Sequence, residues 1–264
     1  MSFLNKYGKY ALITGGTSGI GAAFADQLAQ KGLNIVLVAR RQNLLQTKAS
    51  ELTQKYKIDV KTIQADLTKT EDFDKVFKTS ENLEIGLVIA CAGMENHGLF
   101  TKIDSQKLIS EIQLNVTSLM VITHHFAQKM VPRKRGGVLL VSSIIGHMPN
   151  PYFSNYAGTK AFVVNFGTSL NGEMKKHNID VTVLSPGPTN TPMVEGMNVD
   201  MTKFPMTMHQ PEYTAKIGLD ALGKKPVVIP GFKNAMMVKM SNIIPYKIAI
   251  KSGAVIISKA MNLK

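Results

Sequence analysis

Tyr156 and Lys160 stand four positions apart in the stretch "NYAGTK", residues 155–160. On a helix, positions i and i+4 share one face, so the phenol and the ammonium would be neighbours. A free tyrosine has a pKa near ~10, and a nearby ammonium lowers that pKa by stabilising the phenolate. Such a pair can donate and accept a proton near neutral pH. The same spacing also suits simple helix packing, so the pair alone does not decide between catalysis and structure.

A glycine-rich stretch, "TGGTSGIG" at residues 14–21, offers a second kind of chemistry. It follows the apolar run "YALITG" and precedes a helical pattern. Glycines at such a turn let the backbone approach a pyrophosphate, which then accepts hydrogen bonds from the free N–H groups of the helix. A glycine turn needed only for packing is the alternative. The flanking strand and helix favour a dinucleotide-binding loop.

The next apolar run ends in Arg40 and Arg41, within "VLVARRQN", and has no acidic residue beside it. Folds that bind NAD usually carry an acidic residue here, which accepts hydrogen bonds from the adenine ribose. A guanidinium instead suits the 2′-phosphate of NADP, which a carboxylate would repel. We therefore expect NADP(H) as the cofactor. If Arg40 and Arg41 are only solvated residues at the start of a helix, the choice between NAD and NADP stays open.

Short apolar runs must position these residues. They lie at 10–15, 34–40, 60–66, 85–93, 137–143, 180–187 and 226–231. They are rich in Val, Ile and Leu without alternating polar residues, as in strands that helices cover on both faces.

Helical patterns stand between these runs, at 19–32, 43–56, 70–81, 104–130 and 154–178, the last with Ser154 as its N-cap. Alternating units of this kind predict an α/β fold, a Rossmann-type doubly wound parallel sheet with helices on both faces. We expect one domain over residues 1–231, with a substrate lid at 192–212. A basic amphipathic helical extension, divided at Pro245, follows over residues 232–264.

Seven short motifs run along the chain in a fixed order. They are "TGGTSGIG", "AD" at 65–66, "CAG" at 91–93, "LN" at 114–115, "SS" at 142–143, "YAGTK" at 156–160 and "PGPTNT" at 186–191. In these motifs the chain resembles the short-chain dehydrogenase/reductase family of single-domain type, over residues 8–230.

The resemblance implies a catalytic tetrad of Asn115, Ser143, Tyr156 and Lys160. It also implies which residues contact the cofactor. They are Gly15, Thr17, Ser18, Gly19, Ile20, Gly21, Arg40, Arg41, Asp66, Leu67, Cys91, Ala92, Gly93, Tyr156, Lys160, Pro186, Gly187, Thr189 and Thr191. Asp66 and Leu67 would border the adenine, and the residues from Pro186 onward would contact the nicotinamide. Cys91 stands where the family usually has asparagine.

The family's activity implies an NADP(H)-dependent oxidoreductase that interconverts a carbonyl and an alcohol. In reduction, hydride would reach the carbonyl carbon while Tyr156 protonates the oxygen and Ser143 donates a hydrogen bond to it. Lys160 would also hold the nicotinamide ribose, and Asn115 would kink its helix around a proton-relaying water. The alternative is a non-catalytic cofactor-binding regulatory or scaffold protein, which has no chemical need for the complete tetrad.

The substrate class depends on the predicted lid, which contains Met193, Met197, Met201, Met206 and Met208. Methionine is flexible and polarisable, so a lid of this kind suits an apolar ligand. We expect a lipophilic ketone or aldehyde, such as an oxoacyl chain or a steroid-like molecule. Packing of these methionines against the body of the protein is an equally weighted alternative.

The net charge of +13 is concentrated near the C-terminus, where eight lysines and no acidic residue follow Asp220. This tail can lie on an anionic membrane surface, cover a neighbouring subunit, or cover the substrate pocket. The lysines are not interleaved with aromatic residues in a known module, so we expect no nucleic-acid partner. The family resemblance implies a homo-oligomer, either a dimer or a tetramer.

One cysteine, Cys91, excludes an intrachain disulfide and a thiolate zinc cluster. The histidines are not spaced like metal ligands, so we expect no metal. No secretory signal and no run of ~18 uncharged apolar residues is recognisable. We expect a cytoplasmic protein, with the tail as a means of peripheral membrane contact.

Overall fold

Seven parallel strands form the central sheet of the protein, in a computed structural model that describes residues 3–197, 199–204, 206–241 and 243–261. The strands are β1 (Tyr10–Thr14), β2 (Asn34–Ala39), β3 (Val60–Gln64), β4 (Ile85–Ala90), β5 (Gly136–Val141), β6 (Ile179–Leu184) and β7 (Val227–Val228). Their spatial order is β3-β2-β1-β4-β5-β6-β7, and each neighbouring pair is parallel. The predicted doubly wound fold is confirmed, although β7 has only two residues.

Both faces of the sheet are apolar because helices cover both. In β1, Leu12 joins the core on one face, whereas Ala11 and Ile13 join the core on the other. This two-sided burial explains why the strands appear in the sequence as continuous apolar runs.

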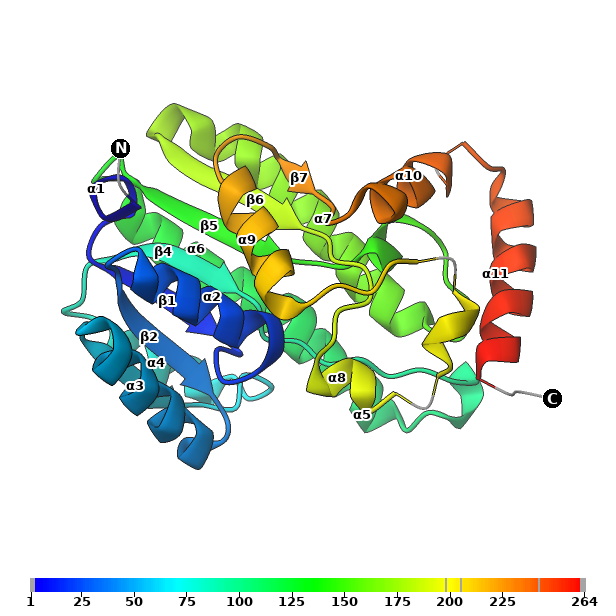
Figure 1. The fold of residues 1–264 in the computed structure, drawn as a ribbon, viewed down its shortest axis with the longest axis horizontal. Coiled ribbons are helices and arrows are strands. Elements are labelled where there is room, and N and C mark those ends of the chain that lie inside the picture. Colours follow the sequence, from blue (N-terminus) through cyan, green and yellow to red (C-terminus); the bar gives the residue numbers. More distant parts are fainter. Residues whose placement is uncertain (1–2, 198, 205, 242, 262–264) are drawn as a thin grey trace.

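The helices form two layers around the sheet (Figure 1). One face packs against α1 (Phe3–Tyr7), α2 (Gly19–Gln30), α3 (Gln42–Tyr56) and α9 (Pro211–Ala221). The other packs against α4 (Glu71–Thr79), α6 (Leu119–Met130) and α7 (Ser154–Met174). The short helix α1 was not predicted; its buried Tyr7 donates a hydrogen bond to Asp180 Oδ2 at 2.7 Å.

The predicted helix at 104–130 is divided in the structure. It consists of α5 (Ser105–Ile112), a π-helical turn η2 (Gln113–Ser118) and α6. Asp104 Oδ1 caps α5 by accepting from the N–H of Gln106 at 2.8 Å. A π-turn of this kind often occurs at a functional site, and Asn115 lies within it.

The start of α7 differs by one residue from the prediction. Ser154 is the first helical residue rather than the N-cap, and Phe153 occupies the cap position without a side-chain bond. Phe153 instead packs against Tyr156, so apolar contact replaces a polar cap. A short 3-10 turn, η4 (Lys175–His177), extends α7 close to the predicted end.

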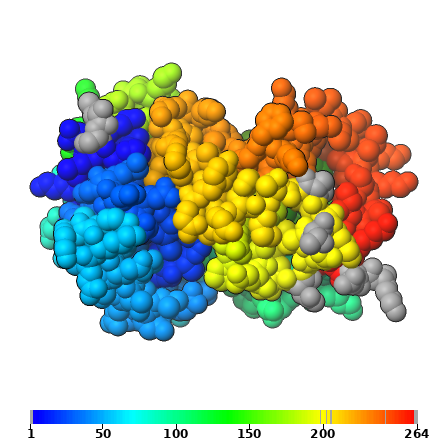
Figure 2. All heavy atoms as spheres, in the orientation of Figure 1, coloured from blue at the N-terminus to red at the C-terminus, as the bar shows by residue number. Residues whose placement is uncertain are grey.

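The C-terminal extension contains α10 (Phe232–Ser241) and α11 (Tyr246–Ala260), with Pro245 at the N-cap of α11 as predicted. Both lie at the opposite end of the molecule from the N-terminal strands and helices (Figures 1 and 2). None of the helices in the described ranges combines the length and apolar character needed to cross a bilayer.

The predicted lid contains a short helix α8 (Pro192–Glu195) and a 3-10 turn η5 (Met201–Lys203). Two hydrogen bonds join this region to α11. The N–H of Asp200 donates to the carbonyl of Ala260 at 3.0 Å, and Lys203 Nζ donates to the carbonyl of Lys259 at 3.0 Å. Of the predicted lid and tail, residues 198, 205, 242 and 262–264 lie outside the described residues.

Candidate active site

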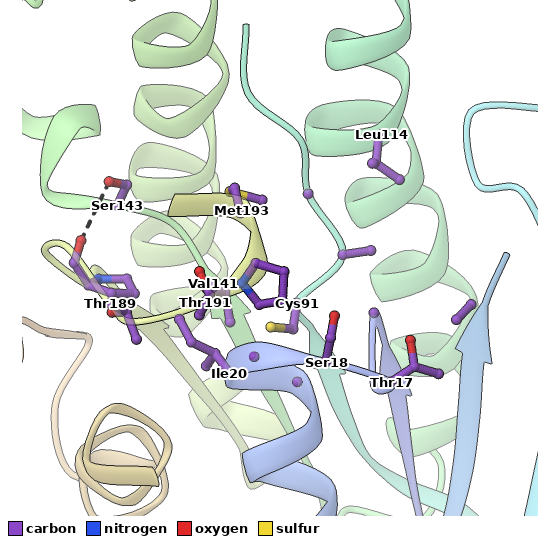
Figure 3. Close-up of a pocket in the computed structure, with 18 of the residues that line it drawn as sticks. Thr17, Ser18, Ile20, Cys91, Leu114, Val141, Ser143, Thr189, Thr191 and Met193 are labelled. Atoms are coloured by element: carbon purple, nitrogen blue, oxygen red, sulfur yellow. Dashed lines mark hydrogen bonds between the residues drawn. The ribbon is translucent and has the colours of Figure 1, made fainter. Parts of the chain in front are cut away.

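A pocket opens at the carboxyl ends of β1, β4 and β5, where the order of the strands reverses. Its walls come from the glycine-rich loop before α2, from the loops after β2, β4 and β5, and from residues 186–194 after β6 (Figure 3). The structure brings every predicted site residue to this pocket except Asp66 and Asn115.

The glycine-rich loop is packed too closely against its neighbours to carry side chains at Gly19 and Gly21. Gly19 has a φ of 52°, and a Cβ there would lie 2.8 Å from Thr191 Cγ2. A Cβ on Gly21 would lie 2.2 Å from the carbonyl oxygen of Gly15. Ser18 holds the N-cap position of α2 without a side-chain bond, so its hydroxyl leaves the first N–H groups of the helix uncapped. This cradle fits the pyrophosphate of a dinucleotide.

The far end of the pocket carries positive charge. Arg40 and Arg41 are exposed and line the pocket together with the apolar residues Val38, Ala65 and Leu67. Within the described residues, neither guanidinium forms an ion pair. Both guanidinium groups therefore remain available for an anionic group at this end.

Asp66, predicted to border the adenine, does not line the pocket. Its Oδ1 accepts from the hydroxyl of Thr68 at 2.8 Å, and its own N–H donates to Asp72 Oδ2 at 2.6 Å. The carboxylate thus closes its own turn, and Leu67 rather than Asp66 reaches the pocket wall.

The end of β4 is fixed through its backbone. Thr14 Oγ1 accepts from the N–H groups of Cys91 and Ala92, at 3.1 and 3.0 Å. Burial raises the pKa of the Cys91 thiol to about 12, and Lys160 opposes this rise. The thiol is therefore neutral near pH 7. Because the strand end is held by backbone donors, cysteine fits where the family usually has asparagine.

Ser143, Tyr156 and Lys160 lie together on the wall of the same pocket. Ser143 follows β5, and its Oγ donates to the carbonyl of Pro186 at 3.4 Å (Figure 3). Tyr156 and Lys160 are buried, with 9% and 5% exposed. Lys160 Nζ lies 5.6 Å from the centre of the Tyr156 ring and donates to the carbonyl of Val141 at 3.0 Å.

Burial dominates the proton affinities of this pair. Burial raises the pKa of Tyr156, and the negative charge of Glu95 adds to the rise, whereas the hydroxyl of Ser143 lowers it. Burial lowers the pKa of Lys160 to about 8. From the sequence, Lys160 was expected to lower the pKa of the Tyr156 phenol. In the structure, burial instead holds Tyr156 protonated, which is the form that can protonate a carbonyl oxygen.

Asn115 lies behind the pocket wall rather than on it. It is fully buried, and its Oδ1 accepts from the N–H of Met94 at 3.0 Å. Its Nδ2 donates to the carbonyl of Met94 at 2.8 Å and to Thr159 Oγ1 at 3.1 Å. Asn115 therefore joins the π-turn to the loop after β4 and to α7.

The side of the site beyond Tyr156 is apolar. Phe153, Tyr156 and Ile257 of α11 form a buried cluster. Partly buried apolar side chains pack against the cluster; they are Ile145, Tyr152, Met197, Val199, Phe204 and Met261. Of the methionines in the predicted lid, Met197 packs here and Met193 lines the pocket, whereas Met208 is exposed. Packing against the body of the protein thus describes Met197, and contact with an apolar substrate stays a prediction.

Several residues at the site were not among the predicted catalytic and cofactor contacts. Val38, Ala39, Ala65, Leu114, Val141, Ser142, Pro192, Met193 and Val194 also line the pocket. Most lie next to the recognised motifs, so adjacency to a motif was the available signal. Glu95 and Ile257 had no sequence signal, because their effects on Tyr156 depend on contacts between distant segments.

Comparison with known proteins agrees with this geometry. A family model described as "short chain dehydrogenase" matches residues 9–202. A 7β-hydroxysteroid dehydrogenase of Mediterraneibacter gnavus is 31% identical over 89% of this chain and 90% of that protein.

Two solved structures are also similar. One, reported for insights into 7β-hydroxysteroid dehydrogenase stereoselectivity, has a TM-score of 0.88 and 27% identity over 96% of this chain and 100% of that chain. The other, a short-chain dehydrogenase from Sphingobium yanoikuyae in complex with NADPH, has a TM-score of 0.79 and 30% identity over 89% of this chain and 94% of that chain. The present chain, with its glycine-rich cradle and its Ser143, Tyr156 and Lys160 on one pocket, therefore belongs to the short-chain dehydrogenase family and is an oxidoreductase.

Proposed function

We propose that the protein is an NADP(H)-dependent reductase of lipophilic ketones or aldehydes. The observation that carries the proposal is that Ser143, Tyr156 and Lys160 line the same pocket as the glycine-rich loop. A bound nicotinamide nucleotide supplies the hydride for the carbonyl carbon. The protonated phenol of Tyr156 gives its proton to the carbonyl oxygen, and Ser143 donates a hydrogen bond to the same oxygen.

Lys160 and Asn115 support this proton transfer. The ammonium of Lys160, close to the Tyr156 ring, stabilises the phenolate that remains after the proton has left. The same ammonium would hold the ribose next to the nicotinamide. Asn115 fixes the loop after β4 against α7 and would hold the water that returns a proton toward Lys160.

The preference for NADP(H) is proposed from Arg40 and Arg41. Both line the pocket at the adenine end and have no carboxylate partner among the described residues. A guanidinium pairs well with a 2′-phosphate. The similar Sphingobium yanoikuyae structure, which contains NADPH, supports the same choice.

A fluorescence titration with NADPH and with NADH tests this preference. One charge-assisted contact is worth about tenfold or more in affinity, so NADPH should bind the wild type at least that much more tightly. Arg40→Ala/Arg41→Ala should lose this advantage while NADH binding is unchanged. Lys69→Ala, an exposed lysine outside the pocket, is the control. Equal affinity for both nucleotides in the wild type would refute the preference.

The substrate class is proposed from the apolar cluster around Tyr156. Phe153, Ile257 and the lid side chains offer mostly apolar contacts to the part of a substrate that extends beyond its carbonyl. A steroid-like ketone is the first candidate because of the similarity to a 7β-hydroxysteroid dehydrogenase. A long-chain oxoacyl compound is the second. A panel of steroid ketones, oxoacyl esters and small polar ketones separates these classes. Faster turnover of the small polar ketones would contradict the proposal.

The outer side of α10 and α11, here called the C-terminal surface, is both apolar and basic. Its exposed apolar residues, including two from the segment between the helices, are Phe232, Met236, Met240, Ile243, Ile244, Tyr246, Ile248, Ile250, Val255 and Ile256. Its exposed lysines are Lys233, Lys239, Lys247, Lys251 and Lys259. We propose that this surface binds an anionic bilayer from the cytoplasmic side. The charge complements anionic headgroups, whereas the same surface on a second copy would be equally basic.

Vesicle co-sedimentation tests this contact. Full-length protein should pellet with vesicles of phosphatidylglycerol and phosphatidylcholine but much less with phosphatidylcholine alone. Lys247→Glu/Lys251→Glu should weaken pelleting, and Lys175→Glu/Lys176→Glu in η4 is the matched control. A truncation is unsuitable because Ile257 of α11 packs against Tyr156. Equal pelleting by both double variants would eliminate the proposed surface.

Self-association is proposed at a different place. The exposed apolar side chains of Phe100, Ile109, Ile112 and Met120 lie on η1 (Phe100–Lys102), α5 and α6. Members of this family are commonly oligomeric, and such side chains suit contact with a second copy. Light scattering should give the mass of two or four chains, and Ile109→Glu should lower it. A single-chain mass for the wild type would contradict this proposal.

A further inference from the structure

Glu111 is a buried carboxylate that the proposed chemistry does not use. It lies in α5 and is 0% exposed. A buried carboxylate costs several kcal/mol unless hydrogen bonds or a cation compensate for the lost water. Within the described residues Glu111 has no ion-pair partner. Its oxygens instead accept from the backbone N–H of Asn96 at 3.0 Å and from Asn155 Nδ2 at 2.6 Å.

These two bonds repeat the contacts of Asn115 one helical turn away. Asn115 joins the loop after β4 at Met94 and joins α7 at Thr159. Glu111, four positions earlier, joins the same loop at Asn96.

Glu111 also completes the second link to α7. Its partner Asn155 stands four positions before Thr159, so the two links lie one turn apart on α7 as well. Three segments that are distant in the sequence are therefore held by two parallel sets of hydrogen bonds. One set belongs to the recognised tetrad, and the other, centred on Glu111, does not.

We propose that Glu111 is a positioning residue for Tyr156, acting through Asn155. Asn155 immediately precedes Tyr156 in the first turn of α7, so its hydrogen bond to Glu111 fixes where that turn begins. The N-cap position of α7 lacks a side-chain bond, and this bond therefore anchors a turn that has no polar cap. The inference rests on the proposed reductase function.

The hydrogen bonds of this contact all run in one direction, from asparagine donors to the carboxylate of Glu111. The carboxylate of Glu111 only accepts, and the groups that hydrogen-bond to it, the Asn96 N–H and the side-chain amide nitrogens of Asn155 and Asn96, only donate. Glu111→Gln would place an amide nitrogen toward one of these donors. Asn155→Asp alone would place two carboxylates against each other. The double variant Glu111→Gln/Asn155→Asp restores a donor facing an acceptor and leaves the oxygen of the introduced amide free to accept from Asn96. It still lacks the bond from Asn155 Nδ2 to the carbonyl of Leu108, so its recovery should be partial.

A double-variant cycle tests this role, with kcat, KM and NADPH affinity measured for each protein. Misplacement of a catalytic group by ~1 Å costs up to about 100-fold in rate, so each single variant should lose roughly tenfold or more in kcat. NADPH affinity should stay within about twofold, because neither residue lines the pocket. The double variant should recover kcat severalfold above both single variants. Glu84→Gln, whose carboxylate pairs with Arg135, is the control.

Three results would overturn the inference. The first is a Glu111→Gln protein with wild-type kcat. The second is a double variant no better than the worse single variant, and the third is parallel loss of NADPH binding and kcat, which would indicate a general folding role. Failure of the proposed function itself would look different, because the wild type would then bind NADPH without reducing any ketone.

Discussion

Burial shifts the proton affinities of Tyr156 and Lys160 in opposite directions. The phenol becomes harder to ionise, and the ammonium becomes easier to deprotonate. Both shifts have the same cause, because a buried site disfavours the charged form of either group. At neutral pH the pair therefore consists of a neutral phenol and a charged lysine, which suits reduction of a carbonyl.

The pH dependence of reduction should follow Lys160. Its pKa is lowered to about 8, whereas the pKa of Tyr156 is raised, so Lys160 loses its proton first as the pH rises. With NADPH varied at saturating ketone, kcat/KM should be level near neutral pH and fall above about pH 8. Lys160→Arg keeps its charge, so whatever activity it retains should lack this fall. A wild-type profile that stays level to about pH 10 would contradict the assignment.

Individual site residues were predictable where a motif carries them. Ser143, Tyr156, Lys160 and the glycines line one pocket because backbone turns and helix spacing bring motif residues together. Asp66 does not line it, because its carboxylate closes a local turn. The proposed positioning role of Glu111 could not be predicted from the sequence, because it depends on hydrogen-bond donors from two other segments.

At the level of elements, the turn between β1 and α2 has little room for an added side chain. A Cβ on Gly21 would lie 2.2 Å from the Gly15 carbonyl oxygen, far inside van der Waals contact with backbone. The turn would have to open, and opening would displace the N–H groups at the start of α2.

Gly21→Ala should therefore weaken NADPH binding and lower the melting temperature. Gly172→Ala, in α7, is the matched control, because a Cβ there meets nothing within 4 Å. That control should raise stability by up to ~1 kcal/mol, since alanine is the better helix former. Thermal denaturation and nucleotide titration measure both effects. Wild-type NADPH affinity in Gly21→Ala would show that the turn tolerates the methyl group.

Element boundaries were less predictable than element types. The apolar periodicity continues through residues 104–130, so it could not reveal the π-turn that places Asn115. Pro245 did mark the break before α11, because proline is tolerated at a helix start and not in its interior. Ser154 was misplaced by one residue because packing of Phe153, a tertiary effect, sets the start of α7.

On the scale of the whole molecule, the C-terminal helix α11 returns to Tyr156. Ile257 is 4% exposed and packs with Phe153 and Tyr156, and the hydrogen bonds to Asp200 and Lys203 hold α11 against the lid. From the sequence, this tail could lie on a membrane, cover a neighbouring subunit or cover the substrate pocket. The structure shows that one side of α11 covers the apolar side of the site.

Ile257→Ala should therefore raise KM for a steroid-like ketone severalfold and leave NADPH affinity unchanged. The truncation removes apolar contact beside Tyr156, which weakens binding of an apolar substrate. It should also lower the free energy of unfolding by about 2–5 kcal/mol, as for other buried isoleucines. Ile248→Ala, on the same helix and 58% exposed, should change neither value. Steady-state kinetics at fixed NADPH measures the effect. Identical KM values in both variants would indicate that α11 does not contact the substrate.

The central claim is that Tyr156 protonates a ketone reduced by NADPH in this pocket. The most direct measurement is NADPH-dependent reduction of a steroid ketone by the wild type and by Tyr156→Phe, with NADPH binding measured on the same preparations. The account predicts equal NADPH affinity and a loss of about 10²–10⁴-fold in kcat/KM for the variant. Wild-type rates in Tyr156→Phe would contradict it, as would a wild type that binds NADPH but reduces no ketone of the panel.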